Sequence, residues 1–121
     1  MMVRVFHFQD AETNNRSGYN ARYFADIQFT RKLDTAGFIF ITIPSNSKTE
    51  PHAHMILEEI FIALTPLKMR VNGKELKLDT GDLVVVEPNE SHSIQNHTSK
   101  EGRMLAIKFP NVKDDKVSAD D

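Results

Sequence analysis

Four residues of types that bind transition metals lie in two short segments of the chain. His52 and His54 are separated by one residue, Glu59 follows shortly after, and His92 comes much later, behind a Pro-Asn-Glu-Ser turn. Because side chains alternate faces along a strand, the imidazoles of His52 and His54 project to the same side of an extended segment. Imidazole and carboxylate donors together suit a borderline first-row divalent ion and leave coordination positions open. These residues therefore predict a metal site, although a lone His-x-His pair is equally compatible with ordinary polar residues beside a loop.

Two adjacent carboxylates, Glu58 and Glu59, compete for the place of the acidic ligand. The apolar residues that follow them predict a strand. Strand parity puts Glu59 on the same face as Phe61 and Ala63, and puts Glu58 on the opposite face. We therefore expect Glu59 to be the ligand and Glu58 to face outward or line the rim of the site.

The other candidates for chemistry carry weaker signals. Glu58, Glu90 and Tyr23 are possible general bases, and nothing in the sequence ranks them. His7 and His97 lie outside the two segments, so we expect both to be exposed to solvent instead of binding metal. The catalytic residues beyond the metal ligands are therefore unknown from the sequence.

The candidate metal ligands must be positioned by the rest of the chain, which consists mainly of short β-branched and apolar segments separated by turn residues. This pattern is typical of an antiparallel sandwich or barrel. Asn72-Gly73 predicts a tight hairpin, because both residues tolerate the positive φ of a type I′ turn. Residues 37–43 predict a strand buried on both faces, and Phe38, Phe40 and Phe61 are expected in the core. No segment predicts a helix, so the fold class is all-β. The expected strands are residues 3–8, 22–30, 37–43, 60–64, 67–71, 74–78, 83–87, 91–96 and 104–109.

Length and composition set further limits. A chain of 121 residues can enclose one core, and we expect a single domain at residues 1–110 followed by a flexible polar tail at residues 111–121.

The formal net charge of −2 and the lack of a basic recognition motif argue against a nucleic-acid partner. No apolar stretch approaches the about 20 residues of a membrane span, and the N-terminal residues lack a secretory apolar segment, so a cytoplasmic location is expected. Cysteine is absent, so His, Asp, Glu or backbone oxygen must hold any metal.

The first of the two segments resembles the first motif of the cupin superfamily. That motif is a glycine, five residues, His-x-His, three or four residues, a glutamate, six residues and a second glycine. The chain has Asn46, His52, His54, Glu59 and Pro66 at these positions. The resemblance supports Glu59 as the carboxylate, because Glu-Ile-Phe matches the usual start of the family's strand.

The second segment resembles the second cupin motif, Gly-x5-Pro-x-Gly-x2-His-x3-Asn. Gly81, His92 and Asn96 occupy its ends, Asn89 replaces its inner glycine, and the proline lies one place later, at Pro88. Asparagine is the non-glycine residue that best tolerates left-handed backbone, so this replacement keeps the turn geometry, as Asn46 does in the first motif. We expect Asn96 to support a turn or to orient His92 through a hydrogen bond.

The resemblance, which covers about residues 37–109, implies the cupin double-stranded β-helix, a jelly-roll barrel, with one divalent transition metal inside its open end. It also implies that His52, His54, Glu59 and His92 are the metal ligands; the ion could be Fe, Mn, Ni, Zn or Cu. Members of the family include dioxygenases, isomerases, decarboxylases and lyases. We therefore expect a metal-dependent enzyme acting on a small polar metabolite such as a sugar acid or a dicarbonyl, with a non-catalytic small-molecule-binding or sensor module as the alternative.

The early strands, residues 3–8 and 22–30, carry more apolar side chains than one small barrel needs for its own interior. Exposed strand edges tend to be covered or paired, and two-fold dimers are the commonest oligomers. We therefore expect a homodimer. If these strands simply complete the sandwich of one chain, the protein is a monomer.

Overall fold

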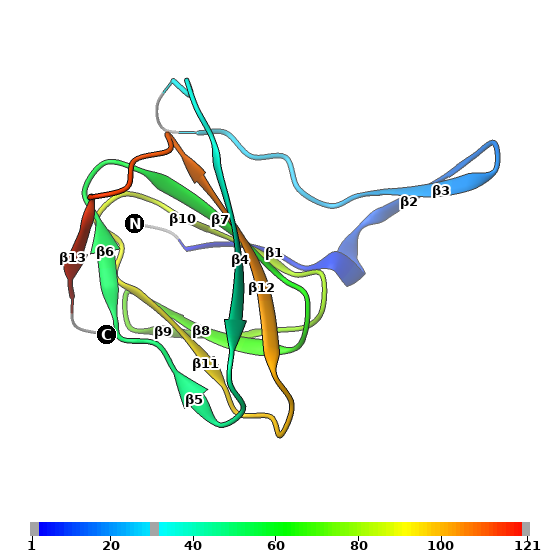
Figure 1. Ribbon diagram of the computed structural model, residues 1–121. Helices are drawn as coiled ribbons and strands as arrows, with labels where there is room; N and C mark the ends of the chain where they lie inside the picture. Colours follow the sequence, from blue (N-terminus) through cyan, green and yellow to red (C-terminus); the bar gives the residue numbers. More distant parts are fainter. Residues whose placement is uncertain (1–2, 30–31, 120–121) are drawn as a thin grey trace.

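The computed structural model describes residues 3–29 and 32–119. Two antiparallel sheets face each other and form a double-stranded β-helix, and a separate hairpin projects from it (Figure 1). The strands of the first sheet are, in spatial order, β1 (Arg4–Phe6), β10 (Leu83–Val86), β7 (Glu58–Ala63), β12 (Gly102–Phe109) and β4 (Gly37–Ile43). Those of the second are β13 (Lys116–Ser118), β6 (His52–His54), β11 (His92–Asn96), β8 (Leu67–Val71) and β9 (Lys74–Leu78), with β5 (Ser47–Lys48) paired to β11. The hairpin joins β2 (Glu12–Arg16) and β3 (Tyr19–Tyr23), and one short 3-10 turn, η1, spans Phe8–Asp10.

Strand alternation builds the core between the two sheets. On β8, Leu67, Met69 and Val71 are buried while the residues between them are partly exposed. These side chains pack against Phe61 and Ala63 of β7, so the parity predicted for the strand that carries Glu59 is confirmed. The same parity directs Glu59, two residues before Phe61, to the interior.

Asparagines hold the tight turns that the sequence predicted. Asn72 and Gly73 have φ angles of 50° and 79°, as a type I′ hairpin turn requires. Asn46 and Asn89, which replace motif glycines, have φ angles of 54° and 69°. The left-handed turns of both motifs are therefore preserved without glycine.

The strand predicted at residues 37–43 is present as β4, but its predicted burial on both faces was wrong. Phe38 and Phe40 are 70% and 60% exposed, although both were expected in the core, whereas Phe61 is buried as predicted. β4 is the terminal strand of its sheet. The apolar residues at 24–29 pack on the outer face of the central strands, around Ile60 of β7 and Val85 of β10. They do not reach the outer face of β4, which stays uncovered.

The N-terminal strands also differ from the prediction. β1 is shorter than residues 3–8, and residues 12–16, for which no strand was predicted, form β2 of the hairpin. The strand expected at residues 22–30 ends at Tyr23; residues 24–29 are not a strand but pack on the outer face of the first sheet. Residue 30 lies outside the described residues.

The C-terminal segment, expected to be a flexible tail, contains a strand that the sequence did not predict. All residues of β13 pair with β6. Asp115, the residue that precedes β13, is buried. Residues 120 and 121 lie outside the described part of the chain. No helix in the described ranges is long and apolar enough to cross a membrane.

Candidate metal centre

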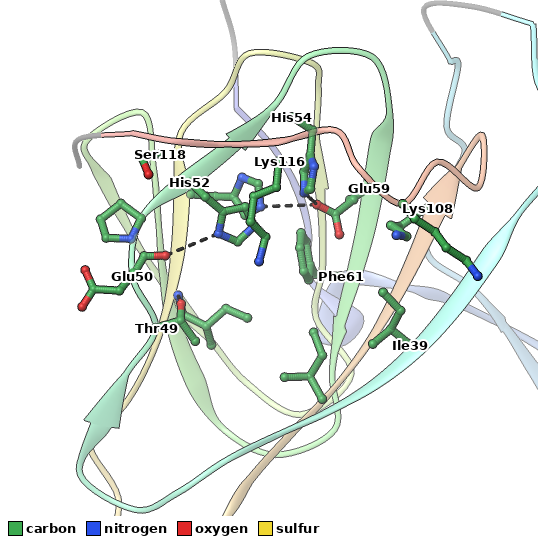
Figure 2. A pocket seen from close by; sticks show the side chains of 15 residues that line it. Ile39, Thr49, Glu50, His52, His54, Glu59, Phe61, Lys108, Lys116 and Ser118 are labelled. Carbon is green, nitrogen blue, oxygen red and sulfur yellow. Dashed lines mark hydrogen bonds and ion pairs between the residues drawn. The ribbon is translucent and has the colours of Figure 1, made fainter.

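Three strands bring together the four residues expected to bind metal. β6 carries His52 and His54, β7 carries Glu59, and β11 carries His92, which lies directly opposite His52 in the pairing of β11 with β6. One ligand atom from each of the four side chains lies within 4.8 Å of the other three (Figure 2). The fold therefore brings His52 and His92, which are 40 positions apart in the chain, into one cluster.

Backbone carbonyls orient two of the imidazoles. His92 Nδ1 lies 3.0 Å from the carbonyl oxygen of Glu90, and His52 Nδ1 lies 3.4 Å from that of Glu50. Because a carbonyl only accepts, Nδ1 must carry the proton in each pair. In the neutral rings, Nε2 then keeps its lone pair for a metal, an arrangement common among metal-binding histidines.

The cluster also contains buried polar atoms that its own members do not satisfy. Glu59 Oε1 lies 2.8 Å from His54 Nε2 and 3.3 Å from His92 Nε2. Despite these short distances, Glu59 Oε1 and His92 Nε2 have no aligned hydrogen-bond partner among the described residues. An unsatisfied buried polar group costs about 1–3 kcal/mol. A cation bound between these atoms would satisfy both, so the donor set fits a divalent metal.

The pKa values of His52 and Glu59 favour the metal-binding protonation states of these two residues. Burial, followed by the charge of His92, lowers the pKa of His52 from 6.5 to about 4. Burial alone would raise the pKa of Glu59, but the adjacent imidazoles of His54 and His92 outweigh it and hold that pKa at about 2. At neutral pH His52 is therefore a neutral ligand and Glu59 an anionic one.

A cavity of about 590 Å³ lies between the two sheets beside the cluster. Such a volume suits a small metabolite. Its apolar wall consists of Ile39, Ile41, Phe61 and Ile94. Its polar groups beyond the four cluster residues are Thr49, Glu50, Lys108, Lys113, Lys116 and Ser118. The cluster thus opens onto a space that holds further polar side chains.

The three possible general bases lie away from this cavity. Glu58 lies on the opposite face of β7, as the parity predicted, but it is fully buried there, and its Oε2 lies 3.7 Å from Arg4 Nη2. β1 lies in the same sheet beside β10, and the apolar residues at 24–29 pack on that outer face. Glu90 is buried and accepts hydrogen bonds from the Glu87 backbone, at 2.6 Å, and from Asn72. Tyr23 is 71% exposed on the hairpin.

The remaining histidines and Asn96 lie outside the cluster. His97 is exposed, as predicted, and contacts Gln95. The His7 side chain is 41% exposed and lies 2.9 Å from Asp82, outside the cluster. Asn96 is buried and donates to several backbone carbonyls around the turn after β11, so its predicted role in a turn is confirmed.

The sequence interpretation missed the contribution of the C-terminal segment. Lys113, Lys116 and Ser118 line the cavity, although all three fall in the predicted tail. The only sequence signal is the alternation of polar and apolar residues in Lys116–Ser118, which is too short to predict a strand. These three side chains are polar groups of the cavity that lie outside both motifs.

A family model described as a cupin domain matches residues 39–108. The chain belongs to the cupin family. This match includes all four cluster residues and confirms the resemblance drawn from the two motifs. No curated protein matches the chain.

Solved cupin structures share the fold of this cupin at low sequence identity. A conserved double-stranded β-helix protein from Klebsiella pneumoniae has a TM-score of 0.65 and 14% identity, covering 76% of this chain and 81% of that one. A sugar phosphate isomerase of the cupin superfamily from Silicibacter pomeroyi has a TM-score of 0.64 and 16% identity, covering 73% and 59%. Salicylate 1,2-dioxygenase from Pseudaminobacter salicylatoxidans has a TM-score of 0.58 and 20% identity, covering 62% and 21%. At such identities the likeness shows the fold alone.

Proposed function

We propose that this cupin is a metal-dependent enzyme that acts on a small polar metabolite in the cavity between the sheets. The observation that carries the proposal is the position of the His52, His54, Glu59 and His92 cluster on the wall of that cavity. Four protein ligands would leave positions free on a six-coordinate ion, and the cavity beside the cluster would give a substrate access to them. The sugar phosphate isomerase and the dioxygenase of the same fold make catalysis on small molecules a reasonable expectation.

A divalent ion bound there would polarise a carbonyl, hydroxyl or carboxylate oxygen of the substrate or would activate oxygen. The chain's own residues supply the rest of the site. The carbonyls of Glu50 and Glu90 fix the imidazoles of His52 and His92, so that the ligands are preorganised. The apolar wall around Phe61 excludes water from one side of the bound metabolite.

The proposed metal site is tested by metal analysis of purified protein. We expect about one divalent transition metal per chain, because the four donors form one compact site. The His52→Ala/His92→Ala double variant should lose this metal. His97→Ala is the matched control and should keep it, since His97 is exposed outside the cluster. Full metal content in the double variant would contradict the proposal.

Catalysis itself is tested by screening sugar acids, diketones and sugar phosphates for turnover that disappears with a chelator. The alternative is a binding or sensor module, and one observation favours it. Among the described residues that line the cavity, Glu50 is the only carboxylate besides Glu59, and its side chain points away from the cluster (Figure 2). Ligand binding without turnover of any of these classes would support the alternative. The cytoplasmic location and the absence of nucleic-acid and membrane partners stay predictions.

A further inference from the structure

The register of β13 on β6 places two further side chains beside the metal cluster. Lys116 pairs with His54, Val117 with Ala53, and Ser118 with His52. Directly opposed residues of antiparallel strands project to the same face of the sheet. Lys116 and Ser118 therefore share the face of the two histidines and line the cavity, while Val117 points away and is 41% exposed.

The Lys116 side chain extends over the cavity beside His52 (Figure 2). Its ammonium forms no ion pair within the described ranges of the chain. Lys108, the half-buried lysine of the lining, is already engaged, because its Nζ donates to the Val112 carbonyl at 3.1 Å. Lys116 is thus a cation without a protein counter-charge on the metal-facing side of the cavity.

The charge of the cavity favours an anion. Its lining holds the ammonium groups of Lys108, Lys113 and Lys116, against the carboxylates of Glu50 and the ligand Glu59. A divalent ion in the cluster would add further positive charge. A neutral metabolite would leave this charge uncompensated, whereas an anionic one would offset it.

Asp115 fixes Lys116 in place relative to the metal ligands. Its carboxylate accepts hydrogen bonds from the backbone N–H groups of Met55, Ile56 and Leu57, at 3.1, 2.8 and 3.0 Å. These three residues join His54 to the strand that carries Glu59. Asp115 is therefore a positioning residue that fastens the start of β13 to the turn between two metal ligands.

We propose that Lys116 and Ser118 form an oxyanion subsite beside the metal centre, and that the substrate carries a carboxylate or a phosphate group. The ammonium of Lys116 would bind one oxygen of this group and the Ser118 hydroxyl would donate to another. The metal and Lys116 would then hold the same small anion from two sides. This inference rests on the proposed metal-dependent function.

Anion binding to the cobalt(II)-loaded protein tests the subsite without any assay of turnover. Visible absorption of the cobalt follows titration with glycolate, inorganic phosphate and, as an uncharged match for glycolate, ethylene glycol. Lys116→Gln should weaken binding of both anions about 10-fold or more, because hydrogen bonds to charged groups contribute about 1.5–3 kcal/mol. Lys74→Gln, the matched control, should change it by less than about 3-fold, since Lys74 is an exposed lysine on β9 that does not line the cavity. Tighter binding of phosphate supports a phosphate ester as substrate, and tighter binding of glycolate supports a carboxylate.

Unchanged anion affinity in Lys116→Gln would overturn the subsite, as would equal losses in the two lysine variants. Binding of ethylene glycol as tight as that of glycolate would also overturn it. Cobalt content separates these results from failure of the proposed function, because the metal ligands are intact in both variants. If the wild type takes up no cobalt, the metal site fails; calorimetric titration of metal-free protein with inorganic phosphate then decides the subsite by the same comparison of variants.

Discussion

Replacing Asp115 with alanine removes the carboxylate that holds the turn before Glu59. The backbone N–H groups of Ile56 and Leu57 lose their acceptor, and that of Met55 keeps only the Asp115 carbonyl oxygen, at 3.4 Å. Met55 and Ile56 are 60% and 46% exposed, so water can reach their amides after a small movement of the turn. Leu57 is 1% exposed, so its amide stays buried and without an acceptor.

The magnitude follows from this difference. A buried N–H donor left without an acceptor lowers the free energy of unfolding by about 1–3 kcal/mol, and a hydrogen bond to a charged group contributes about 1.5–3 kcal/mol. Counting the Leu57 amide fully and the two hydrated amides at a fraction, we expect Asp115→Ala to lower the free energy of unfolding by about 3 kcal/mol. Metal affinity should fall about 10-fold as well, as for other residues that orient metal ligands.

Urea unfolding at neutral pH measures the first effect and metal titration the second. Asp114→Ala is the control, because Asp114 is an exposed neighbour and should change stability by less than about 0.5 kcal/mol. Burial would raise the pKa of Asp115, but the N–H groups of Leu57, Ile56 and Met55 outweigh it and lower that pKa. The contribution of Asp115 is therefore present above the ordinary pKa of aspartate and is lost as pH falls through the lowered value. A difference between the two variants of under about 1 kcal/mol would refute the reasoning.

Three further predictions follow from the structure. Glu59→Ala should lower metal affinity far more than Glu58→Ala, because only Glu59 faces the cluster; equal losses by metal titration would show that β7 is misplaced by one residue. The early segments pack on the first sheet of their own chain, so the dimer expected from the sequence now depends on the exposed rings of Phe38 and Phe40 on the terminal strand β4. We expect light scattering to give twice the 13.8 kDa mass of one chain, and Phe38→Ser/Phe40→Ser to give the single-chain mass; a single-chain mass for the wild type would refute the dimer. Because the pKa of His52 is about 4 when folded and 6.5 otherwise, the unfolded chain takes up this proton first as pH falls. The metal-free protein should therefore lose stability from pH 6.5 to 4, and His52→Gln should flatten that slope in thermal unfolding measured at several pH values.

The spacing of the ligands and the turns could be predicted from the sequence because both are local properties. Asn72-Gly73 adopts positive φ whatever surrounds it, and period-two alternation along β7 separates Glu59 from Glu58 before any partner strand is known. The motif spacing also identified His52 and His92 as members of one site. Their actual distance depends on the pairing of β11 with β6, which the structure shows.

Burial on the second face of each strand is decided by distant parts of the chain, and there the sequence was insufficient. Phe38 and Glu58 both lie on outward faces, yet Phe38 is exposed and Glu58 is buried, because the N-terminal segment covers β7 and stops short of β4. The sequence of β13 is too short and polar to predict a strand, and only its pairing with β6 places Lys116 opposite His54. The motifs thus specified the metal ligands, whereas long-range strand pairing placed the Lys116 side chain beside them. The register of that pairing decides which face of the sheet each side chain of a short polar strand occupies.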